Sequence, residues 1–241
     1  MPSHRLQWLM EFLEHSLALA LLLMFSPLLA IIMMLITLTS PGPAIYRQVR
    51  VGHNGRLFTL FKLRTMYSNC EQFTGPRWSV PGDPRVTPIG RFLRASHLDE
   101  IPQLLNVLHG EMAFVGPRPE RPEFVIVLTE ALPEYTGRLR VKPGITGLAQ
   151  IQLPPDTDLV SVQKKLTCDL YYVWHQNFWL DLRILIATAL RMCRLPVTWT
   201  LHLLKLPRWD YIPHQYARLS RSLTNAATAF CADHISCGNQ L

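Results

Sequence analysis

An uncharged apolar segment near the N-terminus limits what this chain can fold into more than any other feature. From Ser16 to Ser40 the sequence SLALALLLMFSPLLAIIMMLITLTS contains no Asp, Glu, Lys or Arg. A run of about 20 apolar residues is long enough for a helix to cross the hydrocarbon core of a bilayer. Glu11 and Glu14 precede the run and no small-residue cleavage site follows it, which disfavours a signal peptide. The segment therefore predicts a membrane helix.

Ser26 and Pro27 interrupt this run near its middle. Proline removes a backbone donor and clashes with the carbonyl group one turn earlier, so it kinks or breaks a helix. A serine hydroxyl can satisfy a backbone group that the proline leaves unpaired. Two topologies stay open on this pattern: a kinked helix that spans the bilayer, and a re-entrant helix that returns to the face from which it entered.

The overall composition indicates an anionic partner. The 241 residues carry a formal net charge of +7, which suits lipid headgroups, a phosphorylated substrate or nucleic acid. We expect no nucleic-acid partner, because neither a helix-turn-helix pattern nor an aromatic RNA motif is apparent. The five cysteines are scattered and show no CxxC spacing, which disfavours a disulfide framework or a structural zinc site. A reducing, cytoplasmic compartment fits this cysteine usage.

A β-hairpin is the clearest predicted element after the apolar run. Residues Ile45 to Val51 and Leu57 to Leu63 read as strands joined around Asn54-Gly55, and an NG dipeptide between alternating residues is a strong hairpin signal. Lys62 and Arg64, near the end of the second strand, either add charge to a binding site or decorate a solvated strand face. Residues 67–88 are polar and rich in Pro and Gly, which predicts a surface loop.

The central segment GRFLRASHLDEIPQLLNVLHGEMAFVGPRPE, residues 90–120, carries the main chemical signal. Asp99 and Glu100 are adjacent carboxylates flanked by Arg91, Arg94 and Arg118. A carboxylate can act as nucleophile, base or magnesium ligand, and the forked donors of arginine match phosphate oxygens. This combination is typical of phosphate chemistry.

Helix capping is the competing interpretation of the carboxylate pair. Arg91 to Arg94 reads as part of a short helix, and Ser96 with Asp99 supplies capping chemistry before IPQLLNVLHG, whose apolar residues recur at helical spacing. The pair is thus predicted at a helix N-terminus, where anions are favoured. An isolated Asp-Glu pair in that position would usually do no more than cap the helix.

Two further segments favour anion binding over a simple cap. In GPRP, residues 116–119, two prolines hold Arg118 in a stiff loop, and Gly116 would let the backbone approach a ligand. In the segment RLRVKPGITGLAQ, Gly144 and Gly147 are predicted to form a turn that presents backbone N–H groups to an anion.

The same segments resemble the bacterial sugar transferase family, the monotopic polyprenyl-phosphate glycosyl-1-phosphate transferases. The resemblance rests on SP in the apolar run and on GPAIYRQVRVGHNG, FKLRTM, RFLRASHLDEIPQLLNVLHGEMAFVGPRP, VKPGITGLAQ and DLYYVWHQNFWLDLRI, in the family order. It implies transfer of a sugar 1-phosphate from a UDP-sugar to a polyprenyl phosphate such as undecaprenyl phosphate, with release of UMP. Such a reaction starts the synthesis of exopolysaccharide, O-antigen or another glycoconjugate.

The resemblance also implies roles for individual residues. Asp99 matches the covalent nucleophile of the family, which implies an aspartyl phosphosugar intermediate. Mg²⁺ is the implied cofactor, held by Asp99 with Glu100 beside it. Lys62, Arg94 and Arg118 match basic residues of the family blocks and are expected to bind substrate. Asp181, in the late DL block, is expected to support phosphate, nucleotide or metal.

The implied architecture is mainly α with a small β-hairpin. Ser26 and Pro27 match the family's re-entrant helix break, which implies a catalytic domain on the cytoplasmic face of the inner membrane. We expect the membrane helix in residues 1–40, a compact α/β catalytic domain with interfacial amphipathic helices in residues 41–195, and a basic C-terminal extension in residues 196–241. For the extension, an interfacial helix and a packed helix are equal alternatives. The resemblance allows an oligomer.

Two departures from the family pattern leave a second function open. His97 stands where the family commonly has serine, and IQLPPDTD follows GLAQ where many relatives have a VNGR-like stretch. The alternative is therefore a catalytically inactive, membrane-anchored binding or scaffold protein of the same fold.

Overall fold

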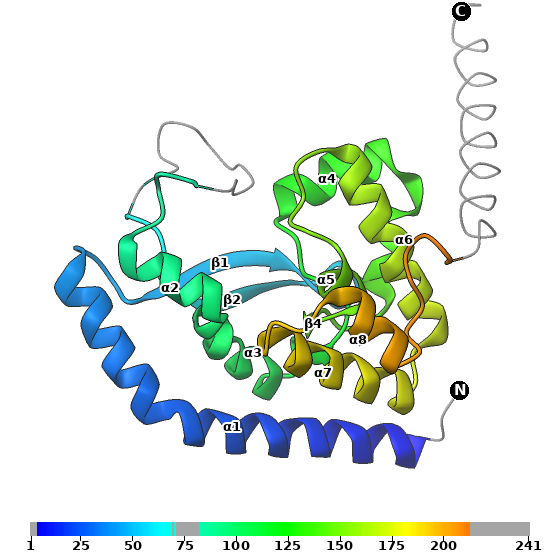
Figure 1. Cartoon of the computed structure of the whole chain (residues 1–241), viewed down its shortest axis with the longest axis horizontal. Helices are drawn as coiled ribbons and strands as arrows, with labels where there is room; N and C mark the ends of the chain where they lie inside the picture. The colour runs from blue at the N-terminus through cyan, green and yellow to red at the C-terminus, as the bar shows by residue number, and fades with distance from the viewer. Residues whose placement is uncertain (1–3, 69, 71–81, 213–241) are drawn as a thin grey trace, which may run out of the picture.

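The structure, a computed structural model, describes residues 4–68, 70 and 82–212 (Figure 1). These residues are mostly helical and include two small sheets, which confirms the predicted mainly α class with a β-hairpin. In chain order the elements are α1 (His4–Thr39), β1 (Ile45–Val51), η1 (His53–Gly55), β2 (Leu57–Leu63), α2 (Pro88–Ser96), η2 (Leu98–Gln103), α3 (Leu104–Leu108), β3 (Ala113–Val115), α4 (Pro122–Ala131), η3 (Pro133–Arg140), β4 (Gly144–Thr146), α5 (Leu148–Gln152), α6 (Leu159–His175), α7 (Phe178–Met192) and α8 (Val197–Leu203), where η marks a 3-10 helix.

The predicted hairpin is confirmed at the predicted residues. β1 and β2 pair antiparallel, with Ile45 opposite Leu63 and Val51 opposite Leu57. In the connecting η1, Asn54 and Gly55 have φ angles of 54° and 77°. Asn and Gly tolerate this left-handed conformation better than other residues, which is why the NG dipeptide located the turn.

Helix α1 runs continuously through the proline and bends along its length (Figure 1). Pro27 has no N–H to donate to the carbonyl group of Leu23, its partner one turn earlier. The hydroxyl of Ser26 donates to that carbonyl at 2.8 Å. The serine therefore satisfies the acceptor that the proline leaves open, as its position in the sequence predicts.

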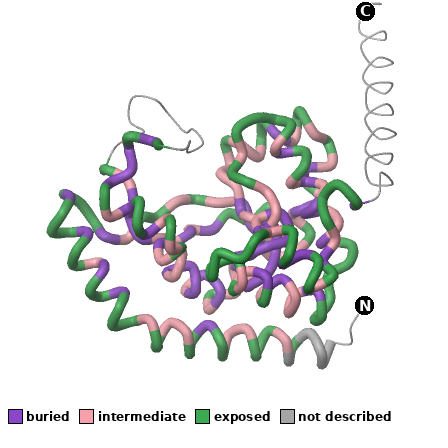
Figure 2. Tube along the Cα trace, viewed as in Figure 1, coloured by how far each residue is buried: buried purple, intermediate pink, exposed green. Residues whose placement is uncertain are grey.

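The surface of α1 is apolar over most of its length. Within the described residues, α1 is the one helix long and apolar enough to cross a membrane, from Met10 to Thr39. Most of its large side chains are exposed, including Leu23 and Leu38 (Figure 2). A smaller set faces the rest of the protein: Ala18 belongs to the main core, and Ile36 packs with Leu63 and Leu93 in a second cluster.

The main core joins elements from both halves of the chain. Its buried side chains come from β2, α3, β3, α5, α6, α7 and α8. β3 and β4 form a parallel pair, with Ala113 opposite Gly144. The predicted glycine turn is therefore wrong at Gly144: this residue starts a strand, and its N–H donates to the carbonyl of Pro117 at 3.0 Å.

The two glycines that were expected to face an anion face each other instead. A Cβ atom added to Gly144 would collide with the backbone nitrogen of Gly116, and one added to Gly116 would collide with the carbonyl oxygen of Lys142. The absence of a side chain at both positions lets two backbone segments come into contact. Gly116 thus approaches the protein backbone and not a ligand.

Part of the segment predicted as a surface loop is ordered against the protein. Residues 69 and 71–81 lie outside the described residues. Asp83 and Arg85, which follow, form a buried ion pair of 2.6 Å, and Val86 forms a β-bridge with Met66. The loop therefore ends in a fixed anchor just before α2.

The C-terminal part of the described chain combines buried and exposed apolar residues. In α8, Leu201 is buried in the main core, whereas Trp199 is 74% exposed. Leu206 and Ile212 belong to the same core. The packed alternative is confirmed for part of this segment, because residues 196–212 contribute side chains to the main core, whereas the interfacial helix stays a prediction. The remainder of the predicted extension, residues 213–241, lies outside the described residues.

Candidate active site

The carboxylate pair lies at a change in helix type. Helix α2 is followed by its C-cap His97, whose φ of 56° lies in the left-handed region. The 3-10 helix η2 then begins at Leu98. Asp99 and Glu100 occupy the first turn of η2. Pro102 lies inside η2 and has no backbone N–H to donate.

The predicted capping role of Asp99 is wrong. No side chain caps η2, and the hydroxyl of Ser96 donates back to the carbonyl of Phe92 at 2.9 Å within α2. Asp99 is therefore not used to satisfy the start of a helix. This outcome removes the simple structural explanation for its carboxylate.

Glu100 is the centre of a three-residue charged cluster. Its Oε1 atom accepts hydrogen bonds from Lys62 Nζ at 2.8 Å and from Arg118 Nη2 at 2.7 Å. Lys62 comes from β2, whereas Arg118 comes from the loop after β3. Burial alone would raise the pKa of Glu100, but Arg118 and Lys62 outweigh it and hold that pKa well below its usual range. Glu100 is therefore an anion at neutral pH.

Asp99 has the opposite environment. It is 7% exposed, and no residue in the described part of the chain donates a hydrogen bond to its carboxylate. Burial raises the pKa of Asp99, the charge of Lys62 opposes that shift, and the charge of Glu100 adds to it. A carboxylate that makes no protein hydrogen bond keeps its oxygen lone pairs available for attack or for a metal ion.

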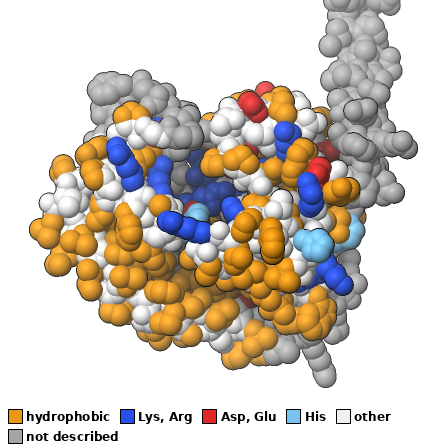
Figure 3. Space-filling model, in the orientation of Figure 1, with side chains coloured by type: hydrophobic (Ala, Val, Ile, Leu, Met, Phe, Trp, Pro, Cys, Tyr) orange, Lys and Arg blue, Asp and Glu red, His pale blue; other side chains and the backbone are white. Residues whose placement is uncertain are grey.

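The structure brings most of the predicted basic residues to the pair. The charges of Lys62, Arg118 and Arg94 all act on Asp99. Arg94 also donates from Nε to Thr65 Oγ1 at 2.9 Å, which orients its guanidinium. Arg91 is exposed on α2, and its charge is not among those that act on Asp99 or Glu100. Figure 3 shows Lys and Arg side chains gathered around a hollow in one face of the molecule, bordered by hydrophobic side chains.

Arg64 has a role that neither sequence interpretation anticipated. Its side chain is buried and donates to the carbonyl oxygens of Ser40 at 2.8 Å and of Pro41 at 2.5 Å. It therefore holds the end of α1 on β2. The alternation of β2 could have indicated this, because Lys62 and Arg64 share a strand face with buried Phe58 and Leu60.

Asp181 lies in a different environment from the other predicted residues. It occupies the first turn of α7, and its Oδ1 accepts a hydrogen bond from the hydroxyl of Tyr172 at 2.8 Å. Burial raises the pKa of Asp181 to about 6. In the described part of the chain it makes no contact with Lys62, Glu100 or Arg118. Its expected support of phosphate, nucleotide or metal stays a prediction.

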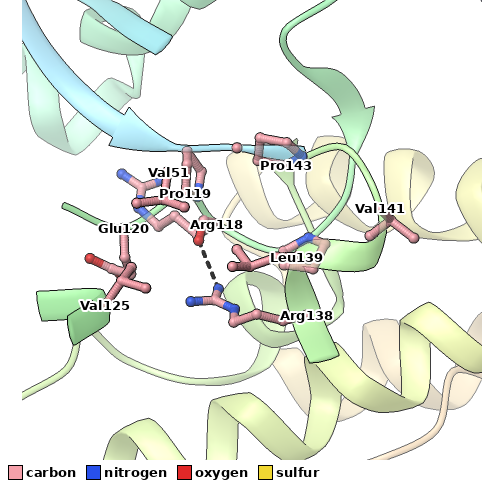
Figure 4. Close-up of a pocket in the computed structure, with 11 residues that line it drawn as sticks. Val51, Arg118, Pro119, Glu120, Val125, Arg138, Leu139, Val141 and Pro143 are labelled. Atoms are coloured by element: carbon pink, nitrogen blue, oxygen red, sulfur yellow. Dashed lines mark hydrogen bonds between the residues drawn. The ribbon is translucent and has the colours of Figure 1, made fainter. Parts of the chain in front are cut away.

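The loop that carries Arg118 rests on a residue that the sequence interpretation did not single out. Arg138, in η3, donates to the carbonyl oxygen of Arg118 at 2.7 Å (Figure 4). A cavity of about 10 Å³ lies beside this contact, which is room for roughly one water molecule. The cavity in Figure 4 is therefore too small to hold a sugar nucleotide.

The carboxylate pair fits a magnesium ion that shares its ligands with a substrate. Mg²⁺ prefers oxygen ligands and is usually held by one or two carboxylates together with substrate phosphates and water. Asp99 supplies an unpaired carboxylate, whereas Glu100 Oε1 is occupied by Lys62 and Arg118. Within residues 4–68, 70 and 82–212, no group of three His, Cys, Asp or Glu side chains could hold a metal ion. The protein alone therefore offers only part of a coordination sphere.

Comparison with known proteins gives consistent matches over the same part of the chain. A family model described as Bacterial sugar transferase matches residues 5–195. An undecaprenyl-phosphate glucose phosphotransferase of Komagataeibacter xylinus is 43% identical over 179 residues, covering 71% of this chain and 33% of the relative. A UDP-glucose:undecaprenyl-phosphate glucose-1-phosphate transferase of Caulobacter vibrioides is 42% identical over 170 residues, covering 69% of this chain and 62% of the relative. The exopolysaccharide production protein PSS of Rhizobium leguminosarum is 38% identical over 177 residues, covering 71% of this chain and 88% of the relative. This chain thus spans less than two thirds of the first two relatives.

Proposed function

The chain belongs to the bacterial sugar transferase family, and we propose that it transfers a sugar 1-phosphate from a UDP-sugar to a polyprenyl phosphate such as undecaprenyl phosphate. The observation that carries this proposal is the charged cluster. Asp99 is buried and receives no hydrogen bond from residues that the structure describes, and next to it Lys62 and Arg118 both donate to Glu100. The relatives named above for transfer of glucose 1-phosphate to undecaprenyl phosphate support the same reaction class.

Asp99 is the proposed nucleophile in a two-step reaction. Its carboxylate oxygen attacks the sugar-proximal phosphorus of the UDP-sugar, and the bond from that phosphorus to the bridging oxygen breaks, so that UMP leaves. An oxygen of the polyprenyl phosphate then attacks the same phosphorus. The bond to Asp99 breaks, which restores the carboxylate and leaves a lipid-linked diphosphosugar.

The basic residues around Asp99 suit a diphosphate substrate. Arginine has five N–H donors in a fixed fork, and Glu100 accepts from Nη2 of Arg118. The Arg118 side chain is 40% exposed, so a substrate can reach it. Lys62 adds a second positive charge that is largely buried. Both cations can offset the negative charge that accumulates on the phosphate oxygens as UMP leaves.

Mg²⁺ is the cofactor that we propose for this site, held by Asp99 and by the Oε2 atom of Glu100. When bound, it would neutralise charge on the diphosphate and stabilise the leaving UMP. The protein's part is to keep Asp99 free of other hydrogen bonds and to keep Glu100 ionised through Lys62 and Arg118.

The same proposal places α1 in the inner membrane as a re-entrant helix, with the catalytic domain on the cytoplasmic face. Near its N-terminal end, Glu11 lies 3.0 Å from Lys142 of the catalytic domain. At its C-terminal end, the carbonyl of Ser40 accepts a hydrogen bond from Arg64, the residue that follows β2. A helix that crossed the bilayer would have its ends on opposite faces, whereas these contacts join both ends to one domain. The bend of α1, a helix with Pro27 in its interior, supports the re-entrant arrangement (Figure 1).

Release of UMP is the test of the transferase function. The protein in detergent is incubated with Mg²⁺, undecaprenyl phosphate and, in separate reactions, UDP-glucose and UDP-N-acetylgalactosamine. We expect steady release of UMP with at least one sugar. No release with either, nor with a wider panel of UDP-sugars, would contradict the proposal and favour the inactive scaffold.

Asp99→Asn is the variant that tests the nucleophile. Without the lipid acceptor, the wild-type protein should release at most one equivalent of UMP and carry a phosphosugar on the peptide that contains Asp99, detectable by mass spectrometry. The amide is a poor nucleophile, so the variant should show neither the release nor the adduct. Sustained turnover by Asp99→Asn would reject this assignment.

A further inference from the structure

Arg138 takes no part in the chemistry proposed above, yet it makes a dense set of contacts under the active-site loop. Its Nη2 atom donates to the carbonyl oxygen of Arg118 at 2.7 Å (Figure 4) and lies 2.8 Å from Oδ2 of Asp169. Its Nη1 atom donates to the hydroxyl of Tyr135 at 2.6 Å. One guanidinium therefore joins η3, α6 and the loop after β3.

These contacts lie in the protein interior. Arg138 is 7% exposed, Asp169 is 4% exposed and Tyr135 is 1% exposed. A buried guanidinium is costly unless it is paired and hydrogen-bonded, and loss of one partner leaves the other charge uncompensated. The ion pair with Asp169 and the bond to Tyr135 therefore keep Arg138 in one position. From that position it can fix the carbonyl of Arg118.

Hydrogen bonds fix the loop on both sides of Arg118: the N–H of Gly144 donates to the carbonyl of Pro117 at 3.0 Å, and Nη1 of Arg50 donates to the carbonyl of Pro119 at 2.9 Å. Pro119 has no N–H, and the two prolines on either side of Arg118 restrict its backbone angles. The loop is anchored before Arg118 by Gly116, whose N–H donates to the carbonyl of Thr146 at 2.9 Å. At Arg118 itself, Arg138 holds the carbonyl oxygen. A displacement there would move the Arg118 side chain away from Glu100, which it contacts at 2.7 Å.

We propose that Arg138, paired with Asp169, is a positioning residue that sets the place of the Arg118 guanidinium against the phosphate groups of the substrate. This inference rests on the proposed transferase function. Arg138 touches neither Asp99 nor Glu100, so it acts through Arg118. Replacement of Arg138 should therefore lower kcat/KM only in a protein that still has Arg118.

A double-mutant cycle tests this dependence. In the wild-type background, Arg138→Gln is expected to lower kcat/KM for the UDP-sugar by roughly 10- to 100-fold, the loss typical when a partner that orients a site residue is removed. An Arg118→Lys background keeps the positive charge but loses the forked guanidinium donors. In that background, Arg138→Gln should have little further effect on kcat/KM. Equal losses in the two backgrounds would overturn the proposal. Asp169→Asn should behave like Arg138→Gln.

Asp158→Ala is the matched control for loss of stability. Asp158 caps α6, the helix that carries Asp169, but it is exposed and does not contact Arg138. We expect a lower melting temperature and an unchanged kcat/KM per folded molecule. If Arg138→Gln does not fold, Arg138→Lys replaces it, because lysine keeps the charge but cannot bond the Arg118 carbonyl and Asp169 with the same geometry.

Hydrogen exchange separates failure of this inference from failure of the proposed function. Amides of residues 113–121 should exchange faster in Arg138→Gln than in Asp158→Ala or the wild type. This measurement needs no substrate. Faster exchange in Arg138→Gln, together with a wild-type protein that releases no UMP, would support the role of Arg138 in holding the loop but reject the transferase function. Unchanged exchange would reject the role of Arg138.

Discussion

At the scale of single residues, the structure gives two adjacent carboxylates different properties. Asp99 is buried, no donor among the described residues bonds its carboxylate, and burial raises its pKa. Glu100 is clamped by Lys62 and Arg118, which hold its pKa well below the usual range. Neighbouring acidic groups whose pKa values are pushed apart are typical of sites that use the two groups differently. Glu100 organises the cations, and Asp99 stays available for chemistry.

Replacement of Lys62 should move the acid limb of the pH–activity profile. In the proposed mechanism the ionised form of Asp99 attacks the substrate, so we expect activity to fall as the pH falls through the pKa of Asp99. Lys62 opposes the increase of that pKa. Lys62→Met should therefore raise the pKa of Asp99 further and shift the acid limb of kcat/KM to higher pH. Measured profiles for Lys62→Met and for Arg91→Gln, the exposed arginine on α2, form the comparison. An acid limb at the wild-type pH in Lys62→Met would contradict the prediction.

At the scale of elements, the side chain of Asn106 in α3 hydrogen-bonds the backbone of β2 on the edge that does not pair with β1. Its side chain is fully buried, with Oδ1 accepting from the N–H of Phe61 at 3.1 Å and Nδ2 donating to the carbonyl of Thr59 at 2.7 Å. β1 pairs with the other edge of β2. The amide side chain thus satisfies an edge of β2 that would otherwise be unpaired, and it joins α3 to the strand that carries Lys62.

Asn106→Leu should be strongly destabilising. The leucine keeps a similar volume but leaves the N–H of Phe61 and the carbonyl of Thr59 unpaired, which costs about 2–4 kcal/mol in the free energy of unfolding. Urea denaturation in detergent measures the change. Asn177→Ala, which removes the cap of α7, is the control and should cost about 1 kcal/mol. Equal losses in the two variants would contradict the proposed role of Asn106.

At the scale of the whole molecule, α1 and the catalytic domain form one structure. Ala18 of α1 contributes to the main core, and Ile36 contributes to a second cluster with Leu63 of β2. Arg64, two residues after Lys62 in sequence, bonds the carbonyl of Ser40 at the end of α1. The same segment of chain therefore contacts Glu100 of the carboxylate pair and the end of α1. This connection links the depth of α1 in a bilayer to the position of the active site.

Labelling of single cysteines tests the topology that follows from these contacts. In a background without the native cysteines, Trp8→Cys and Thr39→Cys place a thiol near each end of α1. We expect a membrane-impermeant maleimide to label both from the cytoplasmic face, as it labels Asn54→Cys in the hairpin loop. Labelling of the two ends from opposite faces would mean that α1 spans the bilayer.

The sequence predicted the elements whose signals are local. The strands of the hairpin are found at the predicted residues, because alternation and the NG turn act over a few positions. The serine that compensates for Pro27 is also a neighbour in sequence. Predictions failed where a distant segment decided the outcome. Gly116 and Gly144 were assigned to a ligand but contact each other's backbone, and Arg64 was assigned to charge or solvent but caps α1.

By itself, the sequence located the long apolar helix α1 and the hairpin, and it singled out the residues that carry the proposed chemistry. These depend on residue type and on spacing along the chain. Only the tertiary structure decided that Lys62 and Arg118 share one oxygen of Glu100 and that Arg138 holds the loop of Arg118. It also decided that Asp99 is buried with no donor from the part of the chain that is described. The physical reason is that burial and hydrogen-bond partners are set by segments far apart in sequence, and these partners determine the charge and position of each side chain.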